Sequence, residues 1–168
     1  MARKRSPVPR GFRTITPHLT VNDAAAAIEF YKAAFGAIEN SRSYADNGAT
    51  IVHSELKIGN SLILLSDEFP EFGILSPTSI GGSSITLHLY VQDVNIIWGQ
   101  AIASGAIELM PLQDAFWGDR FGKVVDPFGH YWSLASRIET VNSKEIARRL
   151  HESWRAQTQW PMESNEVA

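Results

Sequence analysis

The sequence contains no cysteine. This absence excludes disulfide bonds, thiolate metal sites and a cysteine nucleophile, and it fits the reducing cytoplasm in which we expect the protein to reside. Long apolar runs are also missing, since no segment approaches the roughly 18 apolar residues of a membrane-spanning helix. The basic residues at the N-terminus are not followed by the apolar stretch of a secretory signal. We therefore expect no membrane partner.

A strong charge of either sign is absent as well. The net charge is −3, with 44% hydrophobic and 20% charged residues, which is an ordinary globular balance. No basic field is available to attract nucleic acid, so that class of partner is not expected. The one glycine-rich stretch, GGSS at residues 81–84, precedes a predicted strand instead of following one. It therefore belongs to a connecting segment and is not a phosphate-binding loop.

An internal repeat covers most of the chain. Three pairs of segments match in the same order, at offsets of 70, 69 and 70 residues: TPHLTVND (16–23) with TLHLYVQD (86–93), GAIE (36–39) with GAIE (105–108), and GNSLILLS (59–66) with GHYWSLAS (129–136). In the first pair five of eight letters are identical and a histidine stands in the middle each time. The repeat indicates a duplicated unit of about 60 residues.

Each unit reads as strand, helix and three further strands. In the first unit, residues 14–21 alternate between polar and apolar. Asn22 and Asp23 can cap a helix AAAAIEFYKAAF that Gly36 ends. The further predicted strands of the first unit are 38–44, 50–58 and 61–66. The second unit begins with strand 85–91 and a helix from about Asp93 to Ser104, and its further strands are 107–112, 122–125 and 131–136.

The predicted fold class is α+β, with two tandem βαβββ units and a C-terminal helix. The predicted organisation is a flexible tail (1–11), the first unit (12–67), a linker rich in Pro, Gly and Ser (68–84), the second unit (85–138), the helix (139–160) and a tail (161–168). In the helix, Ile146, Leu150 and Trp154 form an apolar stripe at a spacing of four. Such a stripe packs against the protein's own sheet or a second subunit.

Residues 11–138 resemble the vicinal-oxygen-chelate superfamily, which includes glyoxalase I, bleomycin-resistance proteins and dioxygenases. The most specific segments are DAAAAIEFYKAAFGA (23–37), HSELKIGNS (53–61) and FWGDRFGKVVDPFGHYWSLAS (116–136), which look like its PhnB-like branch. The resemblance implies a glyoxalase-like fold, a curved mixed sheet around a central pocket with helices outside, and commonly a homodimer. In that arrangement the apolar residues of both first strands lie beneath the helices: Ile15, Leu19, Val21, Ile85, Leu87, Leu89 and Val91.

The resemblance also implies a divalent metal, but the usual ligand positions fall on Thr16, Ile63, Thr86 and Ser133. Isoleucine has no donor atom, and neutral hydroxyls alone rarely hold a transition metal. We therefore expect no metal cofactor. The alternative is a displaced site built from His18, His88 and Glu55, which could hold Zn, Ni, Mn or Fe.

Three functions stay open. The first is a metal-independent protein of the bleomycin-resistance type that binds a small-molecule ligand in the pocket. The second is a metal-dependent lyase, isomerase or dioxygenase, with Glu55 as candidate catalytic base. The third is an assembly module that uses the terminal helix. The predicted ligand-binding residues are His18, His88, Tyr90, Trp117, Arg120 and Ser133. Trp117 could equally well be a buried structural residue. Asp119 and Arg120 could form a pair that fixes a loop through a charge-assisted hydrogen bond.

Overall fold

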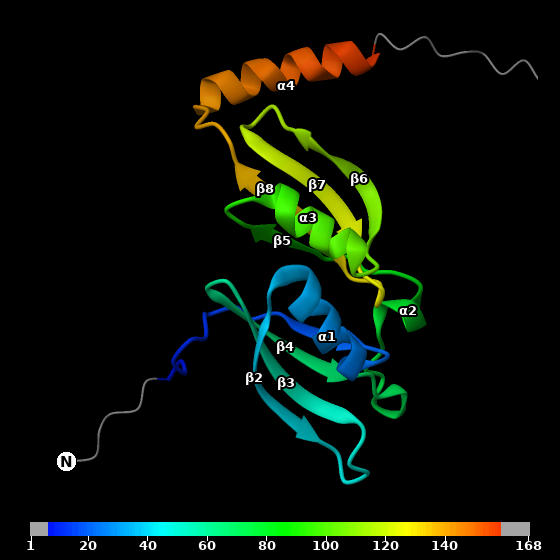
Figure 1. Cartoon of the computed structure of the whole chain (residues 1–168). Coiled ribbons are helices and arrows are strands. Elements are labelled where there is room, and N and C mark those ends of the chain that lie inside the picture. The colour runs from blue at the N-terminus through cyan, green and yellow to red at the C-terminus, as the bar shows by residue number, and fades with distance from the viewer. Residues whose placement is uncertain (1–6, 159–168) are drawn as a thin grey trace, which may run out of the picture.

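Two units with the same order of elements make up the chain in the computed structural model, which describes residues 7–158 (Figure 1). The first unit contains β1 (His18–Val21), α1 (Ala24–Phe35), β2 (Ile38–Tyr44), β3 (Ile51–Ile58) and β4 (Ser61–Asp67). The second contains β5 (Thr86–Tyr90), α3 (Val94–Ala103), β6 (Ile107–Asp114), β7 (Asp119–Val125) and β8 (Tyr131–Arg137). The tandem α+β architecture is confirmed. The predicted tail 161–168 lies outside the described residues.

The helix α1 begins and ends where its capping residues require. The Asp23 side chain accepts a hydrogen bond from the Ala26 amide at 2.9 Å, which satisfies one of the free N–H groups of the first turn. Gly36 ends the helix in the left-handed region at φ 64°, where a residue with a Cβ is strained. These two residues fix α1, and therefore the face of the sheet that it covers.

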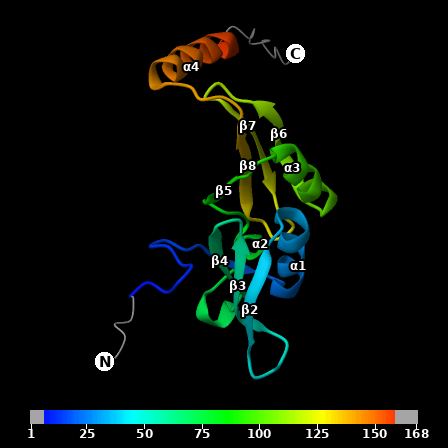
Figure 2. The same ribbon diagram turned by 60° about the vertical axis from the view of Figure 1, so that its left-hand side comes forward.

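Each unit forms its own four-stranded sheet. The strand orders are β1-β4-β3-β2 and β5-β8-β7-β6, and in each sheet the first and last strands of the unit run parallel while the other pairs are antiparallel. Figures 1 and 2 show α1 and α3 side by side on the same side of the two sheets. The opposite face of each sheet is left without a helix from its own unit, and these two helix-free faces carry the candidate site residues.

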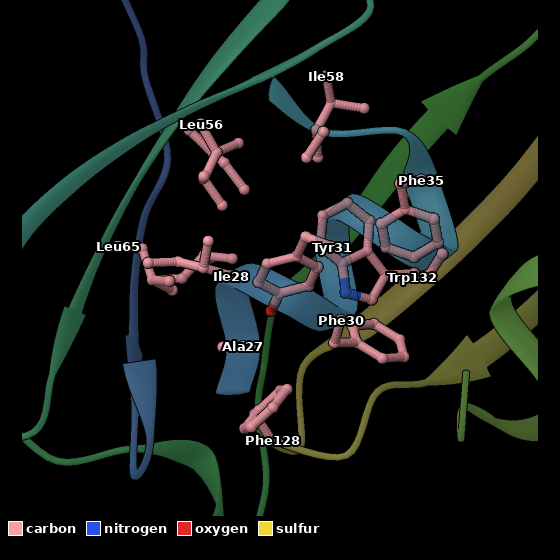
Figure 3. Packing of buried hydrophobic residues seen from close by; sticks show 14 of the residues in the cluster. Ala27, Ile28, Phe30, Tyr31, Phe35, Leu56, Ile58, Leu65, Phe128 and Trp132 are labelled. Atoms are coloured by element: carbon pink, nitrogen blue, oxygen red, sulfur yellow. The ribbon is translucent and has the colours of Figure 1, made fainter. Parts of the chain in front are cut away.

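One hydrophobic core joins the two units (Figure 3). Tyr31 and Phe35 of α1 pack on Trp132 of β8, with ring centroids 5.5 and 4.6 Å apart. Burial of an aromatic side chain of this size stabilises the fold by about 1.5–3 kcal/mol. The aromatic contacts therefore hold the second sheet at a fixed position relative to the first.

The first strand of each unit is shorter than the alternation predicts. β1 begins at His18 because Pro17 has no N–H to donate to the ladder. Leu19 and Val21 lie in the core as expected, but Ile15 and Ile85 are 84% and 67% exposed and do not lie beneath the helices.

The segment between the units is partly helical, with a 3₁₀ turn η1 (Pro70–Phe72) and a short helix α2 (Pro77–Ile80). Glu68 holds these turns together, because its Oε2 accepts hydrogen bonds from the Ser76 amide and the Ser79 hydroxyl. At the other end of the chain, Arg149 of the helix α4 (Ser143–Thr158) forms an ion pair with Glu139, which lies in the segment between β8 and the helix. Arg149 also pairs with Glu145 within the helix.

Candidate functional site

The helix-free face of the first sheet carries His18, His53 and Glu55. Their neighbours along β3, Ser54 and Leu56, are buried on the side of α1, so strand alternation directs His53 and Glu55 to the other face. The rings of His18 and His53 meet edge to face with centroids 6.4 Å apart. His53 Nε2 lies 3.8 Å from Glu55 Oε1. The structure thus brings the predicted His18 and Glu55 to one face, together with His53.

Partial burial lowers the pKa of His18 below 6.5, and the charge of His53 lowers it further, although water still reaches the residue. The imidazole of His18 is therefore neutral at pH 7. A neutral imidazole has one donor and one acceptor nitrogen, so it can bind polar groups of either kind.

The pairing of β1 with β4 corrects one predicted metal-ligand position. His18 pairs with Leu64 in the first sheet, as His88 pairs with Ser133 in the second. The counterpart of Ser133 is therefore Leu64, whereas Ile63 faces the core and is buried. A shift of one residue moves a side chain to the opposite face of a sheet. Leucine has no more donor atoms than isoleucine, so this position still lacks a metal ligand.

The helix-free face of the second sheet carries His88, Tyr90 and Ser133. His88 Nδ1 lies 2.6 Å from Ser133 Oγ, a hydrogen bond that joins β5 to β8. The His88 ring packs edge to face on Tyr90 at 4.5 Å and lies nearly parallel to Phe121 of β7 at 6.2 Å. Three of the predicted ligand-binding residues therefore share one surface, with Phe121 as an additional member.

A buried carboxylate, Asp119, organises the end of this face. It is 0% exposed, and its Oδ2 accepts hydrogen bonds from Tyr90 Oη at 2.6 Å and Trp117 Nε1 at 2.9 Å. Arg137 Nε approaches the other oxygen at 3.5 Å. The hydrogen bond to Asp119, with some burial, raises the pKa of Tyr90 above 10, so the phenol stays protonated at neutral pH. Asp119 thereby fixes the orientation of two aromatic side chains.

A hollow of about 830 Å³ opens on this face beside α4. Trp117 packs edge to face on Phe116 at 4.8 Å and on Phe121 at 5.3 Å, and the three rings form its aromatic wall. The remaining residues that line the hollow are Met110, Gln113, Asp114, Ala115, Gly118, Lys123, Ile138, Glu139, Arg149 and Ser153. Trp117 is thus both anchored by Asp119 and presented to a cavity.

Arg120 lies away from this surface. Alternation along β7 separates it from Asp119 and Phe121, and its guanidinium bonds to Asp114 Oδ1 at 2.7 Å and to Asn95 of α3 at 3.3 Å. Arg120 is on the face that α3 covers, so we leave it out of the ligand-binding set. The sequence pattern did not identify Asp119 and Phe121 as site residues, because the strand was expected to begin at residue 122 instead of 119.

The donor groups do not fit the metal that the resemblance implies. His18 and Glu55 lie on the first sheet, whereas His88 lies on the second and bonds to Ser133. Within residues 7–158, no group of three or more His, Asp or Glu side chains is arranged to hold a metal ion. Of the usual ligand positions, Thr16 and Thr86 offer only hydroxyls. A metal-free site remains a prediction, to be tested on the purified protein.

Comparison with known proteins assigns the fold. Residues 13–134 match the family model described as the Glyoxalase/Bleomycin resistance protein/Dioxygenase superfamily. The uncharacterized protein Mb0911c of Mycobacterium bovis is 42% identical over 135 residues, which span 79% of this chain and 88% of that protein. The X-ray structure of the Arabidopsis thaliana At5g48480 gene product aligns with 30% identity and a TM-score of 0.58, covering 74% of this chain and 98% of that one.

A second solved structure, TioX from Micromonospora sp. ML1, aligns with 24% identity and a TM-score of 0.59, over 77% of this chain and 100% of that one. At this identity the likeness concerns the fold alone. Among the described residues no helix is long and apolar enough to span a membrane.

Proposed function

The chain belongs to the Glyoxalase/Bleomycin resistance protein/Dioxygenase superfamily, and from this premise we propose that it binds a small organic molecule on the helix-free face of its second sheet, without the metal site usual in the superfamily. The motifs at residues 23–37 and 116–136 support a place in its PhnB-like branch. The lack of cysteine accords with a cytoplasmic location.

The observation that carries the proposal is the aromatic wall held by Asp119. A fully buried carboxylate is costly unless each oxygen finds donors, and here the donors come from Tyr90, Trp117 and Arg137. Because the Trp117 ring is fixed before any ligand arrives, little conformational entropy is lost on binding. A preformed aromatic surface beside a hollow is typical of sites for flat apolar ligands.

Polar groups around the wall narrow the class of ligand. The ring of His88 lies 6.2 Å from that of Phe121, and its second nitrogen can bond to a ligand because Ser133 holds only the first. Lys123 brings a cation that has no ion pair within the described part of the chain. Arg149, by contrast, is already neutralised by Glu139 and Glu145. We therefore expect a flat, largely apolar molecule with one hydrogen-bonding or acidic group.

The proposal includes a homodimer. The resemblance implies pairing, and Leu150 and Trp154 of α4 are 37% and 62% exposed. A second copy of the chain is the occupant we propose for the apolar side of α4.

The proposal is tested in two steps: the ligand is identified, and Trp117 of the aromatic wall is then substituted. Native mass spectrometry of protein purified without added metal should detect a co-purified organic molecule and no stoichiometric transition metal. Trp117→Leu should weaken binding of that molecule at least tenfold, because it removes the central ring. Trp117→Phe should weaken it less, because an aromatic ring remains, although it is smaller and lacks the hydrogen bond to Asp119.

Phe72→Leu serves as the control, since it removes an exposed aromatic ring in the segment between the units. Equal effects of Phe72→Leu and Trp117→Leu would reject the wall as the binding site. Close to one zinc, nickel, manganese or iron per chain, lost in His18→Ala or His88→Ala, would replace the proposal with a metal-dependent lyase, isomerase or dioxygenase.

A further inference from the structure

A second hollow, of about 620 Å³, lies on the first sheet beneath the chain segment Pro9–Arg13. We propose that this hollow is a binding site for a small organic anion, a carboxylate or a phosphate compound, held by Arg10, Arg13 and Lys57. Arg10 precedes residues 13–134, which match the family model, whereas Arg13 and Lys57 lie within them.

The segment is an ordered turn. The Phe12 amide bonds to the Pro9 carbonyl at 3.2 Å, and Gly11 between them has φ 92°. A positive φ at the third residue is the geometry of a type II turn, which favours glycine at that position. The turn thus presents Arg10 and Arg13 from a defined backbone and not from a random coil.

The turn covers the sheet directly. Leu62 pairs with Lys57, which puts it on the face away from α1, yet it is only 8% exposed. Gly11 supplies the cover, because a Cβ on this glycine would lie 3.4 Å from Leu62 Cδ1. Phe12 joins Gly11 and Leu62 in lining the hollow. Burial of Leu62 holds the segment on the sheet.

Positive charge dominates the hollow that results. Arg10, Arg13 and Lys57 line it, and none of them has an ion-pair partner among the residues that the structure describes. The one carboxylate in the lining is Glu55, which faces His53 at 3.8 Å. Three unpaired cations from two distant parts of the chain converge on one cavity, an arrangement that favours an anionic ligand.

The neutral groups in the lining suit the same ligand. Asn40 and Asn60 offer amide N–H donors to anionic oxygens. Arginine side chains bind carboxylates and phosphates through paired hydrogen bonds, and such charge-assisted bonds are the stronger ones. Glu55 would repel an anion placed against it, so we expect the ligand's charge on the side of the turn.

The test uses the full ¹⁵N-labelled chain and two probes, inorganic phosphate and succinate, each titrated against sodium chloride at matched ionic strength. We expect saturable changes in the backbone amide resonances of Gly11, Phe12, Asn40, Lys57 and Asn60. Arg13→Gln and Lys57→Gln should each weaken the affinity about tenfold, because each removes one charged contact. Lys144→Gln, which removes an exposed cation on α4, should change it less than twofold.

Gly11→Val distinguishes a structured binding site from nonspecific electrostatic attraction of anions. It keeps every charge but strains the turn, because Gly11 has φ 92°, a conformation that a residue with a side chain rarely adopts, so it should also abolish the saturable change. Saturation with phosphate alone assigns a phosphate ligand, and saturation with succinate alone assigns a carboxylate. Changes that follow ionic strength without saturating, or an equal loss in Lys144→Gln, overturn the proposal. The wall at Trp117 lies in a different hollow, so either site can fail without the other.

Discussion

The Tyr31 hydroxyl donates a hydrogen bond to Asp126 Oδ2 at 2.7 Å, across 95 residues of sequence. The same oxygen accepts a second bond from Trp132 Nε1 at 2.9 Å, and both side chains are buried. Tyr31 belongs to the first unit, whereas Asp126 and Trp132 belong to the second. A single carboxylate therefore ties the helix α1 to the turn before β8, inside the core that the two units share.

Asp126→Ala should lower the free energy of unfolding by more than about 3 kcal/mol. The Oδ1 atom of Asp126 also accepts bonds from the Phe128 and His130 amides, so the change leaves four donors, three of them buried, without an acceptor. Tyr31→Phe removes only one bond and should cost about 1 kcal/mol. Chemical denaturation measures both. Asp114→Ala, at an exposed ion pair, is the control and should change stability by less than about 1 kcal/mol. Similar losses in all three variants would contradict the central role of Asp126.

Gly122→Ala should destabilise the second unit by about 1–3 kcal/mol. A Cβ at Gly122 would lie 2.5 Å from Trp98 Cζ3 and 3.1 Å from the Leu112 Cα, so either α3 or β6 has to shift. Gly99→Ala is the matched control. Gly99 lies within α3 with nothing near its Cβ position, so alanine there should raise helix stability by about 0.5–1 kcal/mol. Thermal or denaturant unfolding of both variants checks the opposite signs. A destabilised Gly99→Ala or an unaffected Gly122→Ala would show that α3 packs differently.

The sequence predicted the regular elements best where a specific residue begins or ends them. α1 starts after Asp23 and stops at Gly36, as expected, and β2 covers residues 38–44, as predicted. The alternation predicts a start of β1 at residue 14, which is too early because periodicity takes no account of the missing N–H of Pro17. The short helices between the units were missed, since a composition rich in Pro, Gly and Ser also fits capped turns.

The face of β4 could not be predicted from sequence. Leu62, Ile63, Leu64 and Leu65 are all apolar, so no alternation shows which of them point away from α1. The match of residues 59–66 with 129–136 begins at the glycines of two turns that differ in length. Its offset is therefore 70, whereas the strand pairing requires 69. Contacts between side chains that are far apart in the sequence could not be predicted either. Asp119 was expected to fix a loop together with Arg120, but its partners are Tyr90, Trp117 and Arg137.

The chain should be a dimer at micromolar concentration, and removal of residues 142–168 should weaken it. The reason is the exposed apolar surface of Leu150 and Trp154, which is removed with α4. Sedimentation velocity of the full and shortened chains measures the change. Leu150→Glu should shift the equilibrium toward monomer, while Lys144→Glu on another side of the helix should not. A full-length monomer, or a dimer that the truncation leaves unchanged, would reject this role for α4.

His18 should titrate below its ordinary pKa of 6.5, because partial burial and, to a smaller extent, the charge of His53 both disfavour the imidazolium. Between the folded and the unfolded pKa, the unfolded chain holds a proton that the folded chain lacks. Stability from this group is therefore complete above pH 6.5 and falls as the pH drops toward the folded pKa. His18→Gln, which cannot titrate, should remove this part of the acid sensitivity.

NMR titration of the imidazole resonances measures the pKa directly. His53→Gln should raise the pKa of His18 only part of the way, since burial is the larger cause. His151→Gln, exposed on α4, should leave it unchanged. A His18 that titrates at or above 6.5, or one restored fully by His53→Gln, would show that the ring is neither buried nor placed as described.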